Sequence, residues 1–168
     1  MRARAQAHPV RLRRPLATTR RSPLAPRAVE GTCSGRNGYI INVNSVDTIG
    51  DGVLSEGKGH ADFAVEFKAV VFYPFRNETL EGRVTRVHDR GFHVDVGPMT
   101  VFVTRHSIPS EFYFDANAVV PQWANTNDAT LSIAPQEKVR LRLQGVRREA
   151  TELSATGTID DAYLGPVQ

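Results

Sequence analysis

From Glu30 onward, apolar residues alternate with polar ones in short runs separated by glycine. This period of two constrains the fold more than any other feature, because successive side chains of a β-strand point to opposite faces. Such runs predict strands that are buried on one side. Stripes with helical spacing are absent from the same part of the sequence. The pattern therefore predicts a mainly β protein built from small domains.

The composition is that of a folded protein, with 168 residues of which 40% are hydrophobic. No run of about 18 apolar residues is present, which excludes a membrane-spanning helix, and no apolar stretch resembles a secretory signal. Cys33 is the single cysteine, so it neither closes a disulfide within the chain nor builds a thiolate-rich zinc site. We expect a soluble intracellular protein without membrane contact.

The net charge of +3 is distributed unevenly along the chain. Residues 1–29 hold eight arginines and no acidic residue. Residues 30–168 therefore carry 13 basic against 18 acidic side chains, a net charge of −5. A nucleic-acid contact in this part must come from a local cluster of arginines rather than from the field of the whole molecule.

Residues 1–29 also contain four prolines: Pro9, Pro15, Pro23 and Pro26. Prolines at this spacing leave no helix of useful length, so we expect a basic leader without regular structure. Three interpretations stay open at this point. The leader is an organelle transit peptide, a solvated basic tail, or a start of the reading frame that is foreign to the natural protein.

Two strands are predicted within residues 30–79, separated by the glycine-spaced stretch "IGDGVLSEGKG", and the second of them is long. In the first, Tyr39, Ile41 and Val43 share one face, which indicates a half-buried strand. The second lies in "HADFAVEFKAVVFYPF", where the apolar residues alternate before both faces become apolar. Its alternating residues are Phe63, Val65, Phe67, Ala69 and Val71.

Pro74 and the polar "RNET" mark a break, so the domain boundary is expected near residue 79. Five strands are predicted beyond it, at Leu80–His88, Gly91–Val96, Thr100–Arg105, Lys138–Val146 and Leu153–Gly157. A long polar loop is expected from Asp115 to Gln136. Five closely coiled strands predict a small barrel, and the three-residue offset between Val84 and Val87 predicts a bulge in its first strand.

The second barrel strand presents a candidate binding surface. Phe92, Val94 and Val96 alternate with His93 and Asp95, so the first set should fill the barrel and the second should face outward. Four arginines are close by in sequence: Arg83, Arg86, Arg90 and Arg105. An outward ring beside arginines suits single-stranded nucleic acid, because bases stack on rings while guanidinium groups contact phosphates.

The pattern "GxVxxVxxxGFxVxVG" followed by "FVTRHS" resembles the S1 type of oligonucleotide-binding (OB) fold. A longer series of strings resembles the stalk subunit family of RNA polymerases, which includes the seventh-largest subunit of eukaryotic RNA polymerase II and its archaeal homologue. These strings are "EGTCSGRNGYIINV", "IGDGVLSEGKG", "FKAVVFYPFRNE", "GPMTVFVTRHSIPSE" and "DDAYLG". The resemblance covers residues 30–168, and "RHSIPSE" with the "YLG" ending look most like the polymerase II member.

The resemblance implies a truncated tip domain of ribonucleoprotein-like fold over residues 30–79 and a five-stranded S1/OB barrel over residues 80–168. It implies a noncatalytic nuclear subunit that needs no cofactor or metal. The implied partners are the small helical stalk subunit, as a heterodimer, the RNA polymerase II core and emerging single-stranded RNA. Family members begin with a strand and a helix ahead of "EGTC", and residues 1–29 resemble neither.

The RNA contacts expected on the barrel are Arg90, His93, Arg83, Arg86, Arg105 and His106. S1 domains commonly place exposed aromatic rings where this chain has Arg90 and His93. The alternative for these two residues is an ordinary solvated pair, and for the other arginines a solvated face with packed stems. His106 alternatively caps the helical turn expected at "SIPSE". Trp123 either packs the polar loop on the barrel or contacts a partner.

Three rival functions remain. One is an organellar S1-type RNA-binding protein, favoured if residues 1–29 are cleaved on import. Another is the equivalent stalk subunit of a different RNA polymerase. The third is a nuclease or RNA-modifying enzyme that uses the barrel as its substrate arm, but no catalytic motif supports it, and His88, His93, His106 and Asp89 have no metal-ligand spacing.

Overall fold

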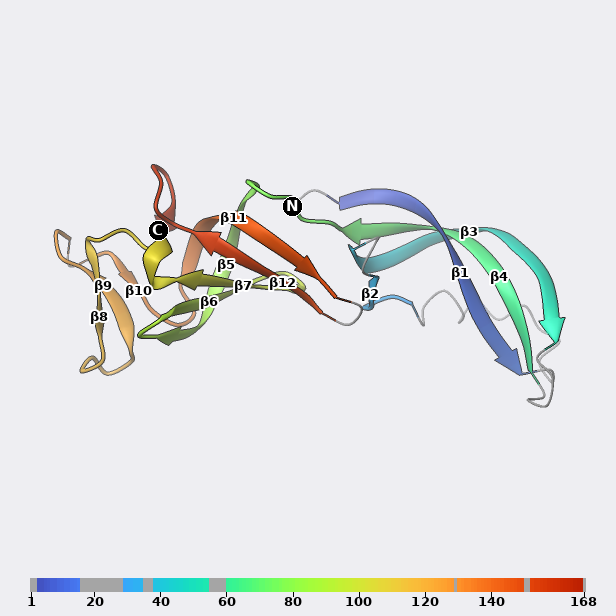
Figure 1. The fold of residues 1–168 in the computed structure, drawn as a ribbon, viewed down its shortest axis with the longest axis horizontal. Coiled ribbons are helices and arrows are strands. Elements are labelled where there is room, and N and C mark those ends of the chain that lie inside the picture. Colours follow the sequence, from blue (N-terminus) through green and yellow to red (C-terminus); the bar gives the residue numbers. More distant parts are fainter. Residues whose placement is uncertain are drawn as a thin grey trace. The chain divides into compact units, whose positions relative to one another are not determined.

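The computed structural model consists of strands almost throughout (Figure 1). It describes residues 3–15, 29–34, 38–54, 60–128, 130–149 and 152–167. The chain divides into two compact units, Arg2–Tyr73 and Pro74–Gln168. The division lies before the expected boundary near residue 79, because the backbone of Pro74–Glu78 forms hydrogen bonds with the strands of the second unit. Asn77 N–H donates to Leu143 O at 2.8 Å, and Leu143 N–H donates to Glu78 O at 3.0 Å.

The first unit is one antiparallel sheet with the strand order β1-β4-β3-β2. Its strands are β1 (Ala3–Pro15), β2 (Cys33–Ser34), β3 (Gly38–Leu54) and β4 (His60–Phe72). The leader was expected to lack regular structure, yet β1 pairs with β4 from Ala3 opposite Phe72 to Pro15 opposite His60. Proline is tolerated there because β1 is an edge strand. Residues 16–28 of the leader lie outside the described part.

Strand β3 is interrupted by repeated bulges that change which of its residues face the core. Its register with β4 shifts between Ile40 and Asn42, between Val43 and Ser45, and twice more along the strand. Each shift places two β3 residues against one of β4, so apolar residues three apart come to the same face. The expectation that Ile41 shares the buried face is wrong, since Ile40 is 2% exposed and Ile41 is 40% exposed.

Strand β4 follows the predicted alternation. Its alternating residues Val65, Phe67, Ala69 and Val71 are buried, and so is Phe72 at the end of the strand, where both faces become apolar. The alternating residues form the core of this unit with Ile40, against which Val29, Val43 and Phe63 pack. The prediction of a long strand lying over a core is confirmed for β4.

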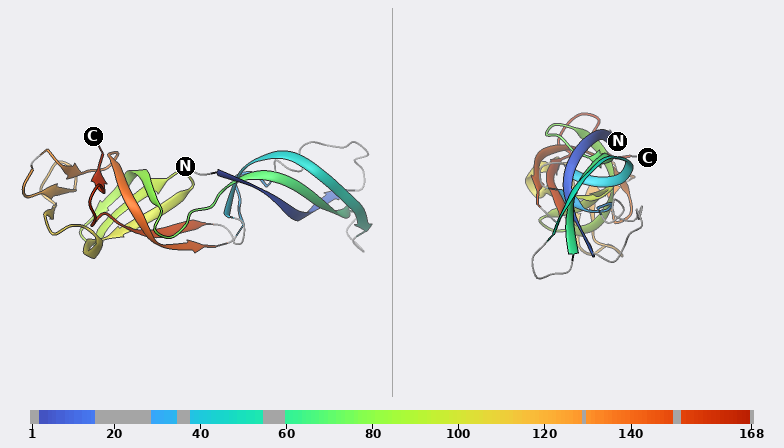
Figure 2. Two further views of the ribbon diagram at one scale, coloured as in Figure 1. Left: turned by 90° about the horizontal axis from the view of Figure 1, so that it is seen from above. Right: turned by 90° about the vertical axis from the view of Figure 1, so that its right-hand side faces the viewer.

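The second unit is built on a closed five-stranded barrel (Figures 1 and 2). Its strands are β5 (Thr79–His88), β6 (Gly91–Val96), β7 (Met99–Thr104), β11 (Lys138–Arg148) and β12 (Leu153–Thr158). They pair in the closed order β5-β6-β7-β12-β11-β5, and the short β13 (Gly165–Pro166) adds to β11. The β12–β7 pair is parallel. The five predicted strands and the barrel are confirmed.

The bulge predicted in the first barrel strand is also present. The register of β5 with β6 shifts between Val84 and Arg86. Val84 and Val87 therefore both reach the interior, with 0% and 9% exposure. At the β5–β6 turn, Gly91 has φ +142°, and a Cβ atom there would overlap Val103 O. The close approach of β6 to β7 therefore requires glycine at this position.

The segment expected to be a long polar loop instead holds a small antiparallel sheet. Its strands are β8 (Phe112–Asp115), β9 (Gln122–Asn125) and β10 (Ser132–Ile133), in the order β10-β9-β8. Trp123 on β9 is 2% exposed, and its Nε1–H donates to His88 O at 3.2 Å. Trp123 thus anchors the inserted sheet on the barrel, which confirms packing over partner contact.

A short 3-10 turn, η1 (Arg105–Ser107), follows β7. Arg105 was expected at the end of the strand and instead begins this turn. Ile159 N–H donates to Ser107 O at 3.0 Å, which joins η1 to the segment that follows β12. Within the described residues, no helix is long and apolar enough to cross a membrane.

Candidate nucleic-acid interface

The outer surface of strands β6 and β7 carries two rings in contact. The burial of Met99, Val101 and Val103 turns the alternate residues of β7 outward, and Phe102 is one of them. In the antiparallel register, Phe102 lies opposite His93 of β6. The ring centroids of His93 and Phe102 are 4.7 Å apart, and their planes are inclined by 42°. The two rings therefore form one composite apolar surface.

A third ring extends this surface onto strand β5. The centroid of the His88 ring lies 5.9 Å from that of His93, at an interplanar angle of 89°. We call His88, His93 and Phe102 the ring cluster. The β5 bulge places Arg86 opposite His93, so a guanidinium group and the cluster occupy neighbouring register positions.

Burial determines the charge state of His93. Burial lowers the pKa of its imidazole, and the nearby His88 and Arg86 lower it further, whereas Asp95 opposes them. The buried Nδ1 atom has no hydrogen-bond partner among the described residues. His93 is therefore a neutral ring at pH 7, as stacking on a base favours.

The predicted arginines fall into two groups. Arg105 N–H donates to Arg90 O at 2.9 Å, which brings these residues together beside the start of β6, and Arg86 lies opposite His93. Arg83 lies on the other side of the bulge, opposite Asp95, and its Nη1 donates to Gln136 Oε1 at 3.5 Å. The register therefore places Arg86 beside the ring cluster and Arg90 next to Arg105, and we call these three residues the arginine group.

Ion pairs distinguish these arginines from others on the barrel. Arg140 pairs with Glu81, with Nη2 2.7 Å from Oε1, and Arg142 pairs with Asp161. Within the described part of the chain, the exposed side chains of Arg86, Arg90 and Arg105 form no ion pair. Their charges are available to an external anion such as a phosphate.

His106 is exposed within η1. The turn has no side-chain cap hydrogen bond at Thr104, whose Oγ1 lies 3.1 Å from Ser107 Oγ instead. Capping of the turn by His106 is therefore not observed in the described structure. His106 directly follows Arg105, a member of the arginine group, in the sequence.

The sequence prediction missed two members of the ring cluster, Phe102 and His88. The signal for Phe102 was available, because the alternation of Met99, Val101 and Val103 already implies an outward Phe102. The proximity of His88 had no such signal, since it depends on the β5 bulge and the pairing register. Among the described residues, no group of three or more His, Cys, Asp or Glu is placed to hold a metal ion.

Comparison with known proteins extends this description. Residues 73–156 match the family model "S1 RNA binding domain", and this range contains all six predicted contact residues. A Dictyostelium discoideum protein, "DNA-directed RNA polymerase II subunit rpb7", is 42% identical over 139 residues, covering 83% of this chain and 80% of that protein. The chain belongs to the RNA polymerase II subunit 7 family. The resemblance found in the sequence is thereby confirmed.

Two further members of the subunit 7 family show the same extent of similarity. "DNA-directed RNA polymerase II subunit 7" of Arabidopsis thaliana is 41% identical, over 83% of this chain and 78% of that protein. The Saccharomyces cerevisiae member, "DNA-directed RNA polymerase II subunit RPB7", is 36% identical, over 83% of this chain and 81% of that protein. In each case the similarity extends well beyond the S1 domain.

Proposed function

We propose that this chain is a noncatalytic stalk subunit of RNA polymerase II that binds emerging single-stranded RNA on the outer surface of β5, β6 and β7. The observation that carries the proposal is the contact between the His93 and Phe102 rings, whose centroids are 4.7 Å apart. Arg86, Arg90 and Arg105 have no ion-pair partners in the described structure. Rings and free guanidinium groups are the two components of sequence-tolerant single-strand binding.

The charge distribution supports a local and weak RNA contact. Residues 30–168 carry a net charge of −5, so the body of the protein repels a polyanion outside the arginine group. Base stacking on a ring contributes about 1–3 kcal/mol per base, which adds to the few phosphate contacts that Arg86, Arg90 and Arg105 offer. RNA therefore binds as a short segment on this surface.

Family membership supports the remaining parts of the proposal. The names of the relatives place them in RNA polymerase II, and we extend this to the present chain with a nuclear location. The chain forms a heterodimer with the small helical stalk subunit, and residues 2–73 dock on the polymerase core. In this position the complex supports transcription initiation and presents the barrel to the transcript.

The deciding experiment measures the binding of a fluorescein-labelled single-stranded RNA to the full chain by fluorescence anisotropy. Phe102→Ala removes one ring of the cluster and should weaken binding roughly fivefold or more, the equivalent of about 1 kcal/mol. Tyr113→Ala is the matched control, because Tyr113 is a 53% exposed ring on the inserted sheet. Wild-type affinity in Phe102→Ala would exclude the ring cluster as the RNA surface.

A further inference from the structure

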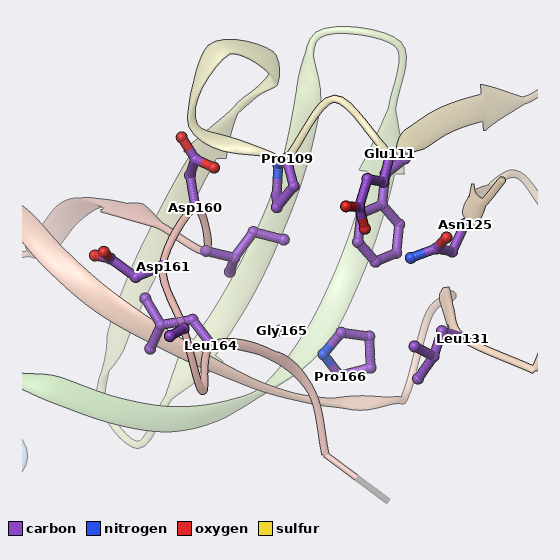
Figure 3. A pocket seen from close by; sticks show the side chains of 12 residues that line it. Pro109, Glu111, Asn125, Leu131, Asp160, Asp161, Leu164, Gly165 and Pro166 are labelled. Carbon is purple, nitrogen blue, oxygen red and sulfur yellow. The ribbon is translucent and has the colours of Figure 1, made fainter. Parts of the chain in front are cut away.

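The second unit contains a pocket that is separate from the ring cluster (Figure 3). Its volume is about 430 Å³. One wall is the segment 159–166, which follows β12 and includes β13, and the other is formed by residues 109–112 with the inserted sheet. Backbone bonds support both walls, since Phe112 N–H donates to Pro109 O at 3.1 Å and Leu164 N–H to Asp161 O at 3.1 Å.

Apolar residues form part of the pocket lining. Ile159 lines it and is 1% exposed, and Phe112, Leu131 and Leu164 contribute further apolar surface. Pro109 and Pro166 complete the apolar lining on either side. A volume of this size accommodates one or two aliphatic side chains, and their burial here supplies hydrophobic binding energy.

The charged residues that line the pocket are all acidic. Glu111, Asp160 and Asp161 contribute carboxylates, and no lysine, arginine or histidine is among the lining residues that the structure describes. Arg142 pairs with Asp161. In the described structure, the exposed carboxylates of Glu111 and Asp160 form no ion pair. The pocket thus attracts a cation and repels phosphate.

Asn125 contributes an amide N–H group to the wall of the pocket. The residue is 9% exposed, and its Oδ1 accepts N–H bonds from Asn127 at 2.7 Å and Asp128 at 3.3 Å. These two bonds determine the orientation of the amide, because Oδ1 must face the two N–H groups. Figure 3 shows the Asn125 nitrogen directed toward the pocket. No acceptor for Nδ2 is found among the described residues.

We propose that this pocket binds an extended segment of a partner protein in which an aliphatic residue adjoins lysine or arginine. The aliphatic side chain packs against the apolar residues of the lining, and the cationic side chain pairs with Glu111 and Asp160. Asn125 Nδ2–H donates to a backbone carbonyl of the segment in place of solvent. RNA is a poor occupant because its phosphates would approach two unpaired carboxylates. The inference is independent of RNA binding at the ring cluster.

The test uses two capped peptides, Ac-Gly-Leu-Arg-Leu-Gly-NH₂ and its counterpart with Glu in place of Arg. Each is titrated into the isotope-labelled full chain while amide NMR signals are recorded. The arginine peptide should shift the signals of residues 159–166 and the Asn125 side-chain amide, and the glutamate peptide should not. Equal shifts with both peptides would overturn the proposal, and so would the absence of shifts at peptide concentrations of about 1 mM.

Variants locate the interaction. The double variant E111Q/D160N keeps the shape of the exposed rim. It should lower the affinity for the arginine peptide roughly threefold to tenfold, because two partly exposed ion pairs are lost. Ala162→Trp fills the mouth of the pocket and should abolish the shifts. Glu152→Gln, which removes an exposed carboxylate outside the pocket, should bind as the wild type does. Unchanged binding in both pocket variants, or the same shifts with a single-stranded RNA, would refute a basic protein segment as occupant.

Discussion

His93 on β6 and Phe102 on β7 lie opposite each other on the outside of the barrel, with ring centroids 4.7 Å apart. Both residues follow the strand alternation that fills the interior with Phe92, Val101 and Val103. The packing of the core therefore also determines which rings face solvent.

His93→Ala should weaken single-stranded RNA binding roughly fivefold or more, because about 1 kcal/mol of base stacking is lost with the ring. His93→Phe keeps a ring at the same position and should retain most of the affinity. Anisotropy titrations of both variants against one labelled RNA measure the difference. A loss of the same size in both variants would show that a flat ring is not what the RNA recognises at this position.

The arginine group should determine the salt dependence of RNA binding. For single strands, the slope of log K against log salt concentration is about −0.7 per phosphate contact. Each of Arg86→Gln, Arg90→Gln and Arg105→Gln should reduce the steepness of the slope by up to about 0.7. Arg140→Gln is the control, since this guanidinium is already paired with Glu81. An equal change in slope for Arg140→Gln would contradict a local phosphate site.

Stability should fall as the pH is lowered through the titration range of His93. Its pKa in the folded protein lies below the ordinary value of about 6.5, so the unfolded chain takes up this proton more readily. The contribution of His93 is therefore fully present above that value and declines below it. Urea unfolding at about pH 7.5 and about pH 5.5 measures the difference, which should be smaller in His93→Phe. An unchanged difference would assign the pH dependence to other groups.

Gly91→Ala should destabilise the barrel by at least about 2 kcal/mol, because the residue has φ +142° and its Cβ would overlap Val103 O. Gly145→Ala is the matched control. Its Cβ would meet only Thr156 Oγ1, at 3.1 Å, and that side chain can rotate away. Chemical denaturation of both variants gives the comparison. Similar losses at the two positions would mean that the close approach of β6 to β7 does not limit the choice of residue.

Trp123→Phe should cost about 1 kcal/mol, since it keeps the buried aromatic ring and removes the hydrogen bond to His88 O. Trp123→Ala should cost about 3–5 kcal/mol, because a large side chain with 2% exposure leaves a cavity. Thermal or urea unfolding measures both values. A loss in Trp123→Phe as large as in Trp123→Ala would contradict this division between packing and hydrogen bonding.

Local patterns in the sequence were sufficient to predict the five barrel strands and the bulge between Val84 and Val87. The period of two reports directly which side chains share a face, and residues such as Phe92 and Val94 follow it without interruption. The family was equally accessible, because its strings occur in order along residues 30–168. The contact of Arg90, His93 and the other predicted residues with RNA stays a prediction.

The alternation of apolar and polar residues gave the wrong buried side chains where a bulge shifts the pairing of two strands. In β3, repeated bulges against β4 bury Ile40 and expose Ile41, although Ile41 alternates with Tyr39 and Val43 in the sequence. The small inserted sheet was missed because its strands are only two to four residues long, and its position depends on Trp123 reaching His88. Neither effect is encoded by neighbours along the chain.

The strands, the inward and outward faces of the barrel and the family can all be predicted from the order of residues alone. The contact of His93 with Phe102, the ion pair of Glu81 with Arg140 and the orientation of the Asn125 amide toward a pocket are visible only in the folded protein. Strand periodicity is a property of consecutive residues. These contacts instead join residues distant in sequence, whose proximity depends on register, bulges and the closure of the barrel.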